Sequence, residues 1–238
     1  MLARMDNTIE LYDLAGRDPA LRFSPYCWRT RFALAHKGLK VATLPWRLHE
    51  GSRLAFTGQG RVPVLVDGER AVFDSWSIAL YLDEHYPDRP GLFGAPAAVP
   101  VVRALNAWAD LTLNPAIARL IVKRVHDLLD PSDQPYFRES REARFGTTLE
   151  ALDLRRETQL GVVREALLPI ARVLAEQPFL AGDSPAYADH IVAGSLMWPA
   201  VTAPWSLVEH DAALTRWFDA MRDAYDHLGR TAVTATSA

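Results

Sequence analysis

Hydrophobic and polar positions alternate with a period of two in the first part of the chain. Residues 8–14 (TIELYDL) show this alternation, which is typical of a strand with one buried face. Residues 41–46 form a second strand-like run. Two shorter apolar runs, residues 64–66 and 71–73, flank the dipeptide Asp67-Gly68, which is favoured in tight hairpin turns. The pattern therefore predicts four strands, of which the last two form a hairpin.

Helix signals lie between and after these strands. Ser24 suits the N-cap position and Pro25 the first helical position, because neither wastes a backbone hydrogen bond there. This helix is expected to run through Ala35 and to stop at Gly38. Ser75 is expected to cap another helix. The order strand, helix, strand, hairpin, helix predicts a thioredoxin-like domain, which is a mixed four-stranded sheet with helices on both faces.

The composition changes after residue 86. Prolines and glycines are frequent in residues 87–100, which predicts a linker. Beyond it the sequence contains no convincing strand pattern. Helices are predicted over residues 101–129 (with a kink or break at Pro115), 147–176, 188–197 and 212–228.

The expected fold class is therefore α/β plus all-α. We expect a thioredoxin-like domain in residues 1–87, a linker in 88–100 and an all-helical domain in 101–238. The second predicted helix is weakened by Gly161 and Pro169. Residues 130–146 are charged and contain proline, so an irregular excursion is expected there. Residues 231–238 are expected to be disordered.

Composition excludes several classes of function. The formal net charge of −3 gives no field that attracts nucleic acid or an anionic membrane. Cys27 is the only cysteine, so neither an intramolecular disulfide nor a cysteine-based zinc site can form, and the histidines lack metal-ligand spacing. The apolar runs are too short to span a membrane, and residues 1–7 are too polar for a signal peptide. We expect a cytoplasmic protein without a metal site.

Ser24 stands at a predicted strand-to-helix junction, in the run Ser-Pro-Tyr-Cys-Trp-Arg. A helix N-terminus presents unpaired amides and partial positive charge, so it favours a nearby thiolate. A hydroxyl at this position can also donate a hydrogen bond to sulfur. Such surroundings lower a thiol pKa from about 8.5 by one or more units, and one unit corresponds to about 1.4 kcal/mol. The alternative is that Ser24 only caps the helix.

Two further motifs follow in the predicted domain. Val62-Pro63 precedes the hairpin, where a cis peptide bond leaves the Val62 backbone available to pair with an extended ligand. Asp74-Ser75 opens the next helix, and a carboxylate and a hydroxyl beside helical amides can hold an amino-acid end of a ligand. Considered alone, Val62-Pro63 is also compatible with an ordinary trans peptide bond, and Asp74-Ser75 with an ordinary helix cap.

The order of these motifs resembles the glutathione transferase superfamily. That family has Ser, Tyr or Cys at the start of its first helix, a cis Val-Pro before its hairpin and Glu/Asp-Ser at its next helix. The matching positions are Ser24, Val62-Pro63 and Asp74-Ser75. The resemblance implies glutathione as co-substrate or cofactor, Ser24 as the catalytic residue and a homodimer. Glutathione contacts are implied for Val62, Pro63, Asp74, Ser75, Gln59 and His49.

Within the superfamily, the sequence is most similar to bacterial glutathione-dependent β-etherases and their fungal relatives, which displace an aryloxide with glutathione thiolate. The matching segments are Ser24-Pro25-Tyr26, Trp28-Arg29-Thr30, Asp74-Ser75-Trp76, Tyr81-Leu82-Asp83-Glu84 and Tyr86-Pro87-Asp88-Arg89-Pro90. A zeta-like isomerase pattern, Ser-x-x-x-Trp-Arg-x-Arg, is also present from Ser24 to Arg31. Three functions therefore remain open: transfer of glutathione to a small hydrophobic electrophile, expected to be aromatic, isomerisation of maleylacetoacetate type, and non-catalytic binding of a hydrophobic ligand.

The sequence departs from the family pattern at two places. Asp74 is shorter than the usual Glu, and Ala186 replaces the hydroxyl residue that caps the helix containing Asp189. Cys27 is interpreted as a packed side chain, since the glutaredoxin nucleophile would stand at position 24. Tryptophans are assigned to the core, with one or two able to line an aromatic-substrate pocket; those considered are Trp108, Trp198, Trp205 and Trp217.

Overall fold

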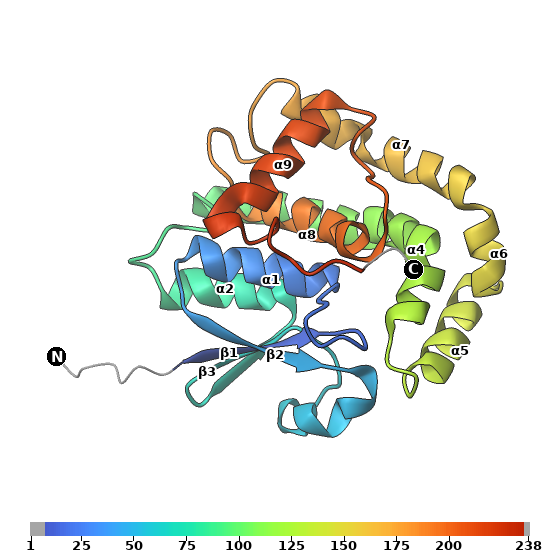
Figure 1. Cartoon of the computed structure of the whole chain (residues 1–238). Coiled ribbons are helices and arrows are strands. Elements are labelled where there is room, and N and C mark those ends of the chain that lie inside the picture. Colours follow the sequence, from blue (N-terminus) through green and yellow to red (C-terminus); the bar gives the residue numbers. More distant parts are fainter. Residues whose placement is uncertain (1–7, 236–238) are drawn as a thin grey trace.

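The computed structural model describes residues 8–235, which begin with a four-stranded sheet (Figure 1). Its strands are β1 (Ile9–Leu14), β2 (Val41–Trp46), β3 (Val64–Asp67) and β4 (Arg70–Phe73). They lie in the order β2-β1-β3-β4. β1 and β2 are parallel, whereas β3 is antiparallel to both β1 and β4. All four strands and the hairpin are thus confirmed.

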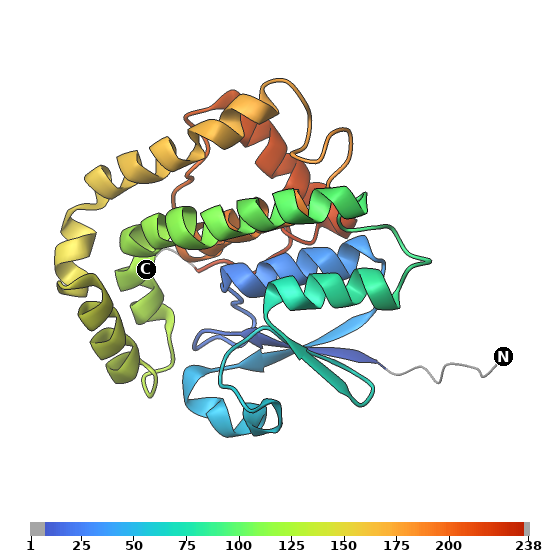
Figure 2. The same ribbon diagram turned by 180° about the vertical axis from the view of Figure 1, so that it is seen from behind.

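Helices cover both faces of this sheet. α1 (Pro25–His36) and α2 (Ser75–His85) lie on one face (Figure 2), where the buried side chains of Leu11 and Leu65 join the main core. A 3-10 helix, η1 (Leu48–Thr57), places Leu54 against Trp46 and Val64 on the other face. The sequence reasoning missed η1, in which Leu54 is the one buried residue.

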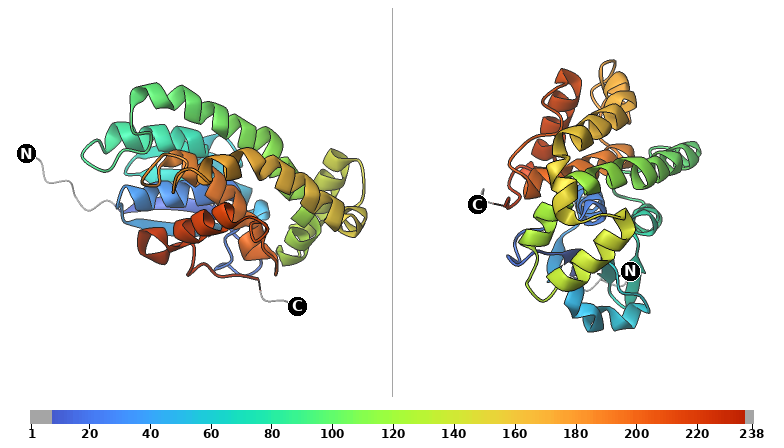
Figure 3. Two further views of the ribbon diagram at one scale, coloured as in Figure 1. Left: turned by 90° about the horizontal axis from the view of Figure 1, so that it is seen from above. Right: turned by 90° about the vertical axis from the view of Figure 1, so that its right-hand side faces the viewer.

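The named elements in the rest of the described chain are all helices, and the chain has the expected two-part fold. The elements are η2 (Pro96–Ala98), α3 (Val99–Trp108), η3 (Ala109–Leu113), α4 (Asn114–Leu128), α5 (Gln134–Phe145), α6 (Leu149–Leu154), α7 (Arg156–Leu174), α8 (Tyr187–Thr202) and α9 (Ala212–His227). Figure 3 shows α8 between α1 and the outer helices. The exact domain boundaries at residues 87 and 100 stay a prediction.

The predicted break near Pro115 is a π-helical turn. α3, η3 and α4 follow one another without a gap, and η3 ends two residues before Pro115. Proline has no N–H to donate and its ring clashes with the carbonyl four residues earlier. A wider π turn directly ahead of it accommodates both effects while the helix continues.

The expectation of an irregular segment over residues 130–146 is wrong, because α5 occupies most of it. Arg138 pairs with Glu142 one turn later at 2.9 Å, and Gly146 ends the helix with a φ of 68°. Phe137 is the one buried side chain of α5. The helix is strongly polar and contains a proline in its first turn, which is why its composition resembles that of an irregular segment, although proline is tolerated at the start of a helix.

The predicted helix over residues 147–176 is divided at Arg155, whose φ of −96° and ψ of 18° separate α6 from α7. Gly161 and Pro169, which weaken the sequence pattern, both lie inside α7. At the C-terminus, the expected disorder is contradicted at Ala235, whose N–H donates to the carbonyl of Val201 at 2.8 Å. Residues 236–238 lie outside the described residues.

α8 holds the helical part against the thioredoxin-like part. A Cβ atom at Gly194 would lie 2.8 Å from Cγ of Arg29 and 2.9 Å from the carbonyl oxygen of Pro25. Glycine is therefore needed where α8 crosses α1. The hydroxyl of Tyr187, at the start of α8, donates to the carbonyl of Ser75 at 2.8 Å. Both contacts fix α8 beside segments that the sequence analysis assigns to a ligand site.

Candidate active site

The strand register brings the sequence-predicted motifs to one edge of the sheet. Val64 pairs with Tyr12 of β1 on one side and with Phe73 of β4 on the other. The carboxyl end of β1, the start of β3 and the end of β4 therefore lie side by side. The segments that follow or precede these ends contain Ser24, Val62-Pro63 and Asp74-Ser75. The motifs share an edge although up to 51 residues of sequence separate them.

Ser24 is the N-cap of α1, with φ of −64° and ψ of 126°. Its Oγ accepts a hydrogen bond from the backbone N–H of Cys27 at 3.3 Å. One accepting lone pair is thus used for capping, and the Cys27 thiol is a second hydrogen-bond partner of the same hydroxyl. A neutral thiol can donate to the other lone pair, which leaves the hydroxyl hydrogen able to donate to a ligand. The residue is 5% exposed, so only a small part of its surface can meet a ligand. Ser24 can therefore cap the helix and donate to a sulfur at the same time.

Cys27 lies one turn further along α1 and is completely buried. Burial raises the pKa of its thiol well above the ordinary value, and the negative charge of Asp13 raises it further. The Ser24 hydroxyl acts in the opposite direction but more weakly. Burial also raises the pKa of Asp13, against the lowering effect of Arg31 and Arg22. A thiol in this position is a packed side chain and a poor nucleophile, as the sequence analysis expected.

The peptide bond between Val62 and Pro63 is cis, as predicted. It stands immediately before β3. The neighbouring Gln59 uses both ends of its side-chain amide on the backbone of Arg61, at 2.8 Å and 2.7 Å. Gln59 therefore shapes the turn that leads to Val62, and its direct contact with glutathione stays a prediction.

Asp74, rather than Ser75, caps α2, which corrects the sequence-based assignment. The Asp74 carboxylate accepts from the backbone N–H of Ser77 at 3.2 Å and from its hydroxyl at 3.3 Å. Its φ of 70° is unusual for a residue other than glycine. A left-handed cap residue costs about 1–3 kcal/mol and recurs at ligand sites. Ser75 is 2% exposed and its carbonyl is held by α8 through Tyr187.

His49 lies on η1. Its Nδ1 is 2.8 Å from the buried carboxylate of Asp133, which also accepts the backbone N–H groups of Leu48 and His49. The hydroxyl of Ser132 is 3.0 Å from the same nitrogen. The ring is 41% exposed, so its other edge can still face a ligand. Asp133 thus orients His49 from the helical part of the chain.

Arg29 supports the candidate site, a role that the sequence did not indicate. In the sequence it was only part of the family pattern from Ser24 to Arg31. Its guanidinium is completely buried and donates to Asp110 at 2.8 Å and to Asn106 at 3.1 Å. It also lies 3.4 Å from the hydroxyl of Ser195. Asn106 and Asp110 are four positions apart in a mostly apolar helix, and this spacing was the sequence feature that could have indicated a buried polar partner. Arg29 ties the first turns of α1, and hence Ser24, to both α3 and α8.

Two features are absent from residues 8–235. No group of three or more metal-ligating side chains comes together there. None of the helices in that range is both long and apolar enough to cross a membrane.

Comparisons with known proteins agree with this architecture. A model of the glutathione S-transferase C-terminal domain matches residues 101–225, and a model of the N-terminal domain matches residues 19–90. Glutathione S-transferase Z1 of Arabidopsis thaliana is 42% identical over 67 residues, which are 26% of this chain and 30% of that relative. Thus the match spans less than a third of the curated relative.

Solved structures match over nearly the whole chain. Glutathione transferase GSTFuA3 from Phanerochaete chrysosporium is 28% identical with a TM-score of 0.82, and the match covers 92% of this chain and 97% of that one. CsGST63524 of Ceriporiopsis subvermispora, solved in complex with glutathione, shares the fold at 24% identity and a TM-score of 0.80, covering 98% and 100%. The two domain matches together show that the chain belongs to the glutathione S-transferase family.

Proposed function

We propose that this protein binds glutathione at the sheet edge formed by β1, β3 and β4 and activates its thiol through Ser24. The observation that carries the proposal is the position of the Ser24 hydroxyl, which caps α1 by accepting from the Cys27 N–H beside the sheet edge where β1, β3 and β4 meet. Membership of the family and the glutathione complex of a protein with the same fold support the choice of ligand.

Ser24 and the N-terminus of α1 stabilise the thiolate in this proposal. The Ser24 O–H donates to the glutathione sulfur, and the unpaired amides of α1 favour its negative charge. The thiol proton passes to solvent. At the other end of glutathione, Asp74 is the proposed partner of the γ-glutamyl ammonium, with Ser75 binding the adjoining carboxylate. Val62, Pro63, Gln59 and His49 complete the proposed binding set.

The proposed reaction is attack of the thiolate on a small hydrophobic electrophile, with cleavage of an aryl ether as the specific form. A carbon–sulfur bond forms at the carbon that carries the aryloxide, and the carbon–oxygen bond breaks. The aryloxide leaves with the bonding electron pair and takes a proton from solvent. Similarity to the β-etherase pattern around Ser24 and in residues 81–90 supports this choice.

An isomerase of maleylacetoacetate type is the second candidate. It is favoured by the run Ser24-x-x-x-Trp28-Arg29-x-Arg31 and by the likeness to plant zeta-class transferases over 67 residues. The amount of glutathione consumed per turnover distinguishes the two reactions. Ether cleavage consumes one glutathione per turnover and yields a thioether, whereas isomerisation regenerates glutathione. Non-catalytic binding of a hydrophobic ligand predicts no glutathione-dependent turnover with either substrate.

The test is turnover with glutathione across an aryl ether ketone, a maleyl acid, a chloronitroarene and a hydroperoxide. Ser24→Ala should lower turnover by roughly ten- to a thousandfold, since a hydrogen bond to a charged group contributes about 1.5–3 kcal/mol. Cys27→Ala is the matched control on the same helix and should stay within a few-fold of the parent. Circular dichroism must show both variants folded, because Ser24→Ala also removes a cap that contributes about 1 kcal/mol.

The direct readout is the ultraviolet absorbance of glutathione thiolate in the bound state against pH. The parent and Cys27→Ala should titrate below the pH at which Ser24→Ala titrates. An unmoved titration curve in Ser24→Ala would refute the role of Ser24. Absence of glutathione binding to the parent at millimolar concentration, measured by calorimetry, would refute the proposed function as a whole.

We further propose a cytoplasmic homodimer with a glutathione-binding domain over residues 1–87 and a substrate-pocket domain over residues 101–238. Large apolar side chains exposed on β4, α2, α3 and η3 support dimerisation. They are Phe73, Leu80, Val101 and Leu111, at 44%, 39%, 71% and 79% exposure. Light scattering coupled to size exclusion should give twice the chain mass of 26.5 kDa. A Val101→Glu variant should shift it toward a single chain.

A further inference from the structure

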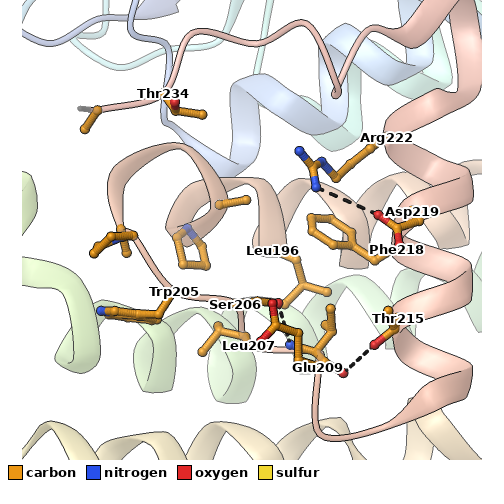
Figure 4. Close-up of a pocket in the computed structure, with 16 residues that line it drawn as sticks. Leu196, Trp205, Ser206, Leu207, Glu209, Thr215, Phe218, Asp219, Arg222 and Thr234 are labelled. Atoms are coloured by element: carbon orange, nitrogen blue, oxygen red, sulfur yellow. Dashed lines mark hydrogen bonds and ion pairs between the residues drawn. The ribbon is translucent and has the colours of Figure 1, made fainter. Parts of the chain in front are cut away.

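A cavity of about 510 Å³ lies in the helical part of the protein, between the end of α8, the segment that follows it, α9 and the chain after α9 (Figure 4). Pockets for small organic ligands are roughly 300–1,000 Å³ in volume. Trp205 lies on the loop side of the cavity, with Phe218 and Arg222 on the α9 side. None of the proposed glutathione contacts lines it.

The cavity is on the side of α8 that faces away from α1. Its α8 lining comes from Leu196, Pro199 and Ala200, followed by Ala203, which have the spacing of one helix face. Gly194, which packs on α1, is two residues before Leu196. Two residues correspond to a rotation of about 200° around a helix. The cavity and the Ser24 region are therefore separated by the body of α8.

A turn within the last residues of α9 determines which charged groups lie at the cavity wall. Tyr225, Asp226 and His227 all have positive φ angles, and they fold the chain back so that the N–H groups of Gly229 and Arg230 donate to the carbonyl of Arg222 at 3.1 Å and 2.9 Å. Folding back in this way brings the Arg230 side chain beside the carboxylates of α9.

Arg230 forms ion pairs with Asp219 and Asp223, the two carboxylates of α9 that are nearest to Arg222 in sequence. It donates to Asp219 at 2.9 Å and to Asp223 at 2.8 Å and 2.9 Å. Arg222 keeps only a 3.8 Å approach to Asp219. Its Nε is buried with no hydrogen-bond partner among residues 8–235. The Arg222 side chain as a whole is 28% exposed, so the remaining N–H donors of its guanidinium can meet an acceptor in the cavity.

The aromatic surroundings define the rest of the ligand. The Arg222 guanidinium lies 6.0 Å from the ring of the buried Phe218, and Trp205 supplies a second aromatic wall. Leu196, Leu207 and Val208 are buried apolar side chains of the same cavity. A planar apolar body fits this wall, and a carboxylate fits Arg222, because guanidinium and carboxylate form charge-assisted hydrogen bonds.

We propose that this cavity is a second ligand site, separate from the thiol site, which binds small aromatic carboxylates with the carboxylate on Arg222 and the ring between Trp205 and Phe218. The two negative residues of the lining, Glu209 and Asp219, favour a ligand with a single anionic group over a polyanion such as a nucleotide. The site requires neither glutathione nor Ser24, so it stands independently of the proposed function.

The test is calorimetric titration of the full chain with naphthalene-2-carboxylate, in the presence and absence of saturating S-methylglutathione. Binding is expected to persist when S-methylglutathione is present. Naphthalene-2-carboxamide, which has the same shape without the charge, should bind at least tenfold more weakly. Arg222→Met should weaken binding of the carboxylate by roughly tenfold or more, and leave the weaker binding of the amide within a few-fold.

Two further variants keep the result interpretable. Arg172→Met, on the exposed side of α7, removes an arginine elsewhere and should leave the affinity unchanged. Ala200→Leu adds side-chain volume to the cavity lining from α8 and should abolish binding, which covers the case in which Arg222→Met does not fold. The proposal is overturned if naphthalene-2-carboxylate does not bind, if S-methylglutathione displaces it, or if either Ala200→Leu or a folded Arg222→Met binds it as the parent does.

Discussion

Gly194 on α8 packs directly against the first turns of α1, which makes Gly194→Ala a sharp test of this interface. The new Cβ would lie 2.8 Å from Cγ of Arg29, 2.9 Å from its backbone nitrogen and 2.9 Å from the carbonyl oxygen of Pro25. Ordinary van der Waals contact begins at 3.4 Å. Because two of these three neighbours are backbone atoms, α8 and α1 must separate by about 0.5 Å.

The magnitude follows from two opposing effects. Overpacking of this kind costs about 1–3 kcal/mol, and rigid backbone neighbours place it near 3. Replacing glycine by alanine inside a helix returns about 1 kcal/mol. The free energy of unfolding should therefore fall by about 2 kcal/mol. At Gly161, inside α7, an added Cβ would meet nothing within 4 Å, so Gly161→Ala should be stabilised by about 0.5–1 kcal/mol.

Equilibrium urea unfolding, followed by circular dichroism, measures both variants against the parent. The two substitutions are chemically identical and both are helical, so propensity cancels between them. The expected gap of roughly 3 kcal/mol then reports the contact between α8 and α1. Equal stability of Gly194→Ala and Gly161→Ala would refute the close approach.

Three other predictions concern buried polar groups. Burial lowers the pKa of His190 well below its ordinary value, so below about pH 6.5 the unfolded chain binds a proton that the native state does not. The free energy of unfolding should therefore decrease as the pH is lowered below 6.5, by up to about 1.4 kcal/mol per pH unit from this residue. His190→Phe should reduce the slope of the free energy of unfolding against pH between pH 6.5 and 5. An identical slope in the two proteins would contradict the burial of a neutral His190. Arg29→Met should lower the free energy of unfolding by about 3 kcal/mol, because it leaves Asp110 and Asn106 without their guanidinium partner. Arg29→Lys should have an intermediate effect, since one ammonium group cannot replace the several N–H donors of a guanidinium. An Arg29→Met variant as stable as the parent in urea unfolding would count against that hydrogen-bond network. The Cys27 thiol, buried and with a raised pKa, should resist Ellman's reagent at pH 8 and react only in guanidinium chloride, whereas rapid labelling of the native protein would disprove its burial.

The sequence by itself determined the local features of this protein. Alternation of period two marks β1, Asp67-Gly68 marks the hairpin of β3 and β4, and Ser24-Pro25 marks the start of α1. Each of these signals is carried by residues next to one another, so local backbone preferences decide it. The same reasoning failed at α5, a strongly polar helix with one buried side chain and a proline in its first turn, because charge and proline also mark irregular segments.

Tertiary structure decided what those features do together. Arg29 meets Asp110 and Ser195, which are 81 and 166 residues away. His49 meets Asp133, 84 residues away, and the aromatic cavity joins Trp205 to Arg222. No propensity or cap encodes such pairs, because their energy comes from burial and charge partners that exist only after the chain has folded. The identity of the proposed thiol-activating group could thus be predicted from sequence, whereas its supports and the second cavity could not.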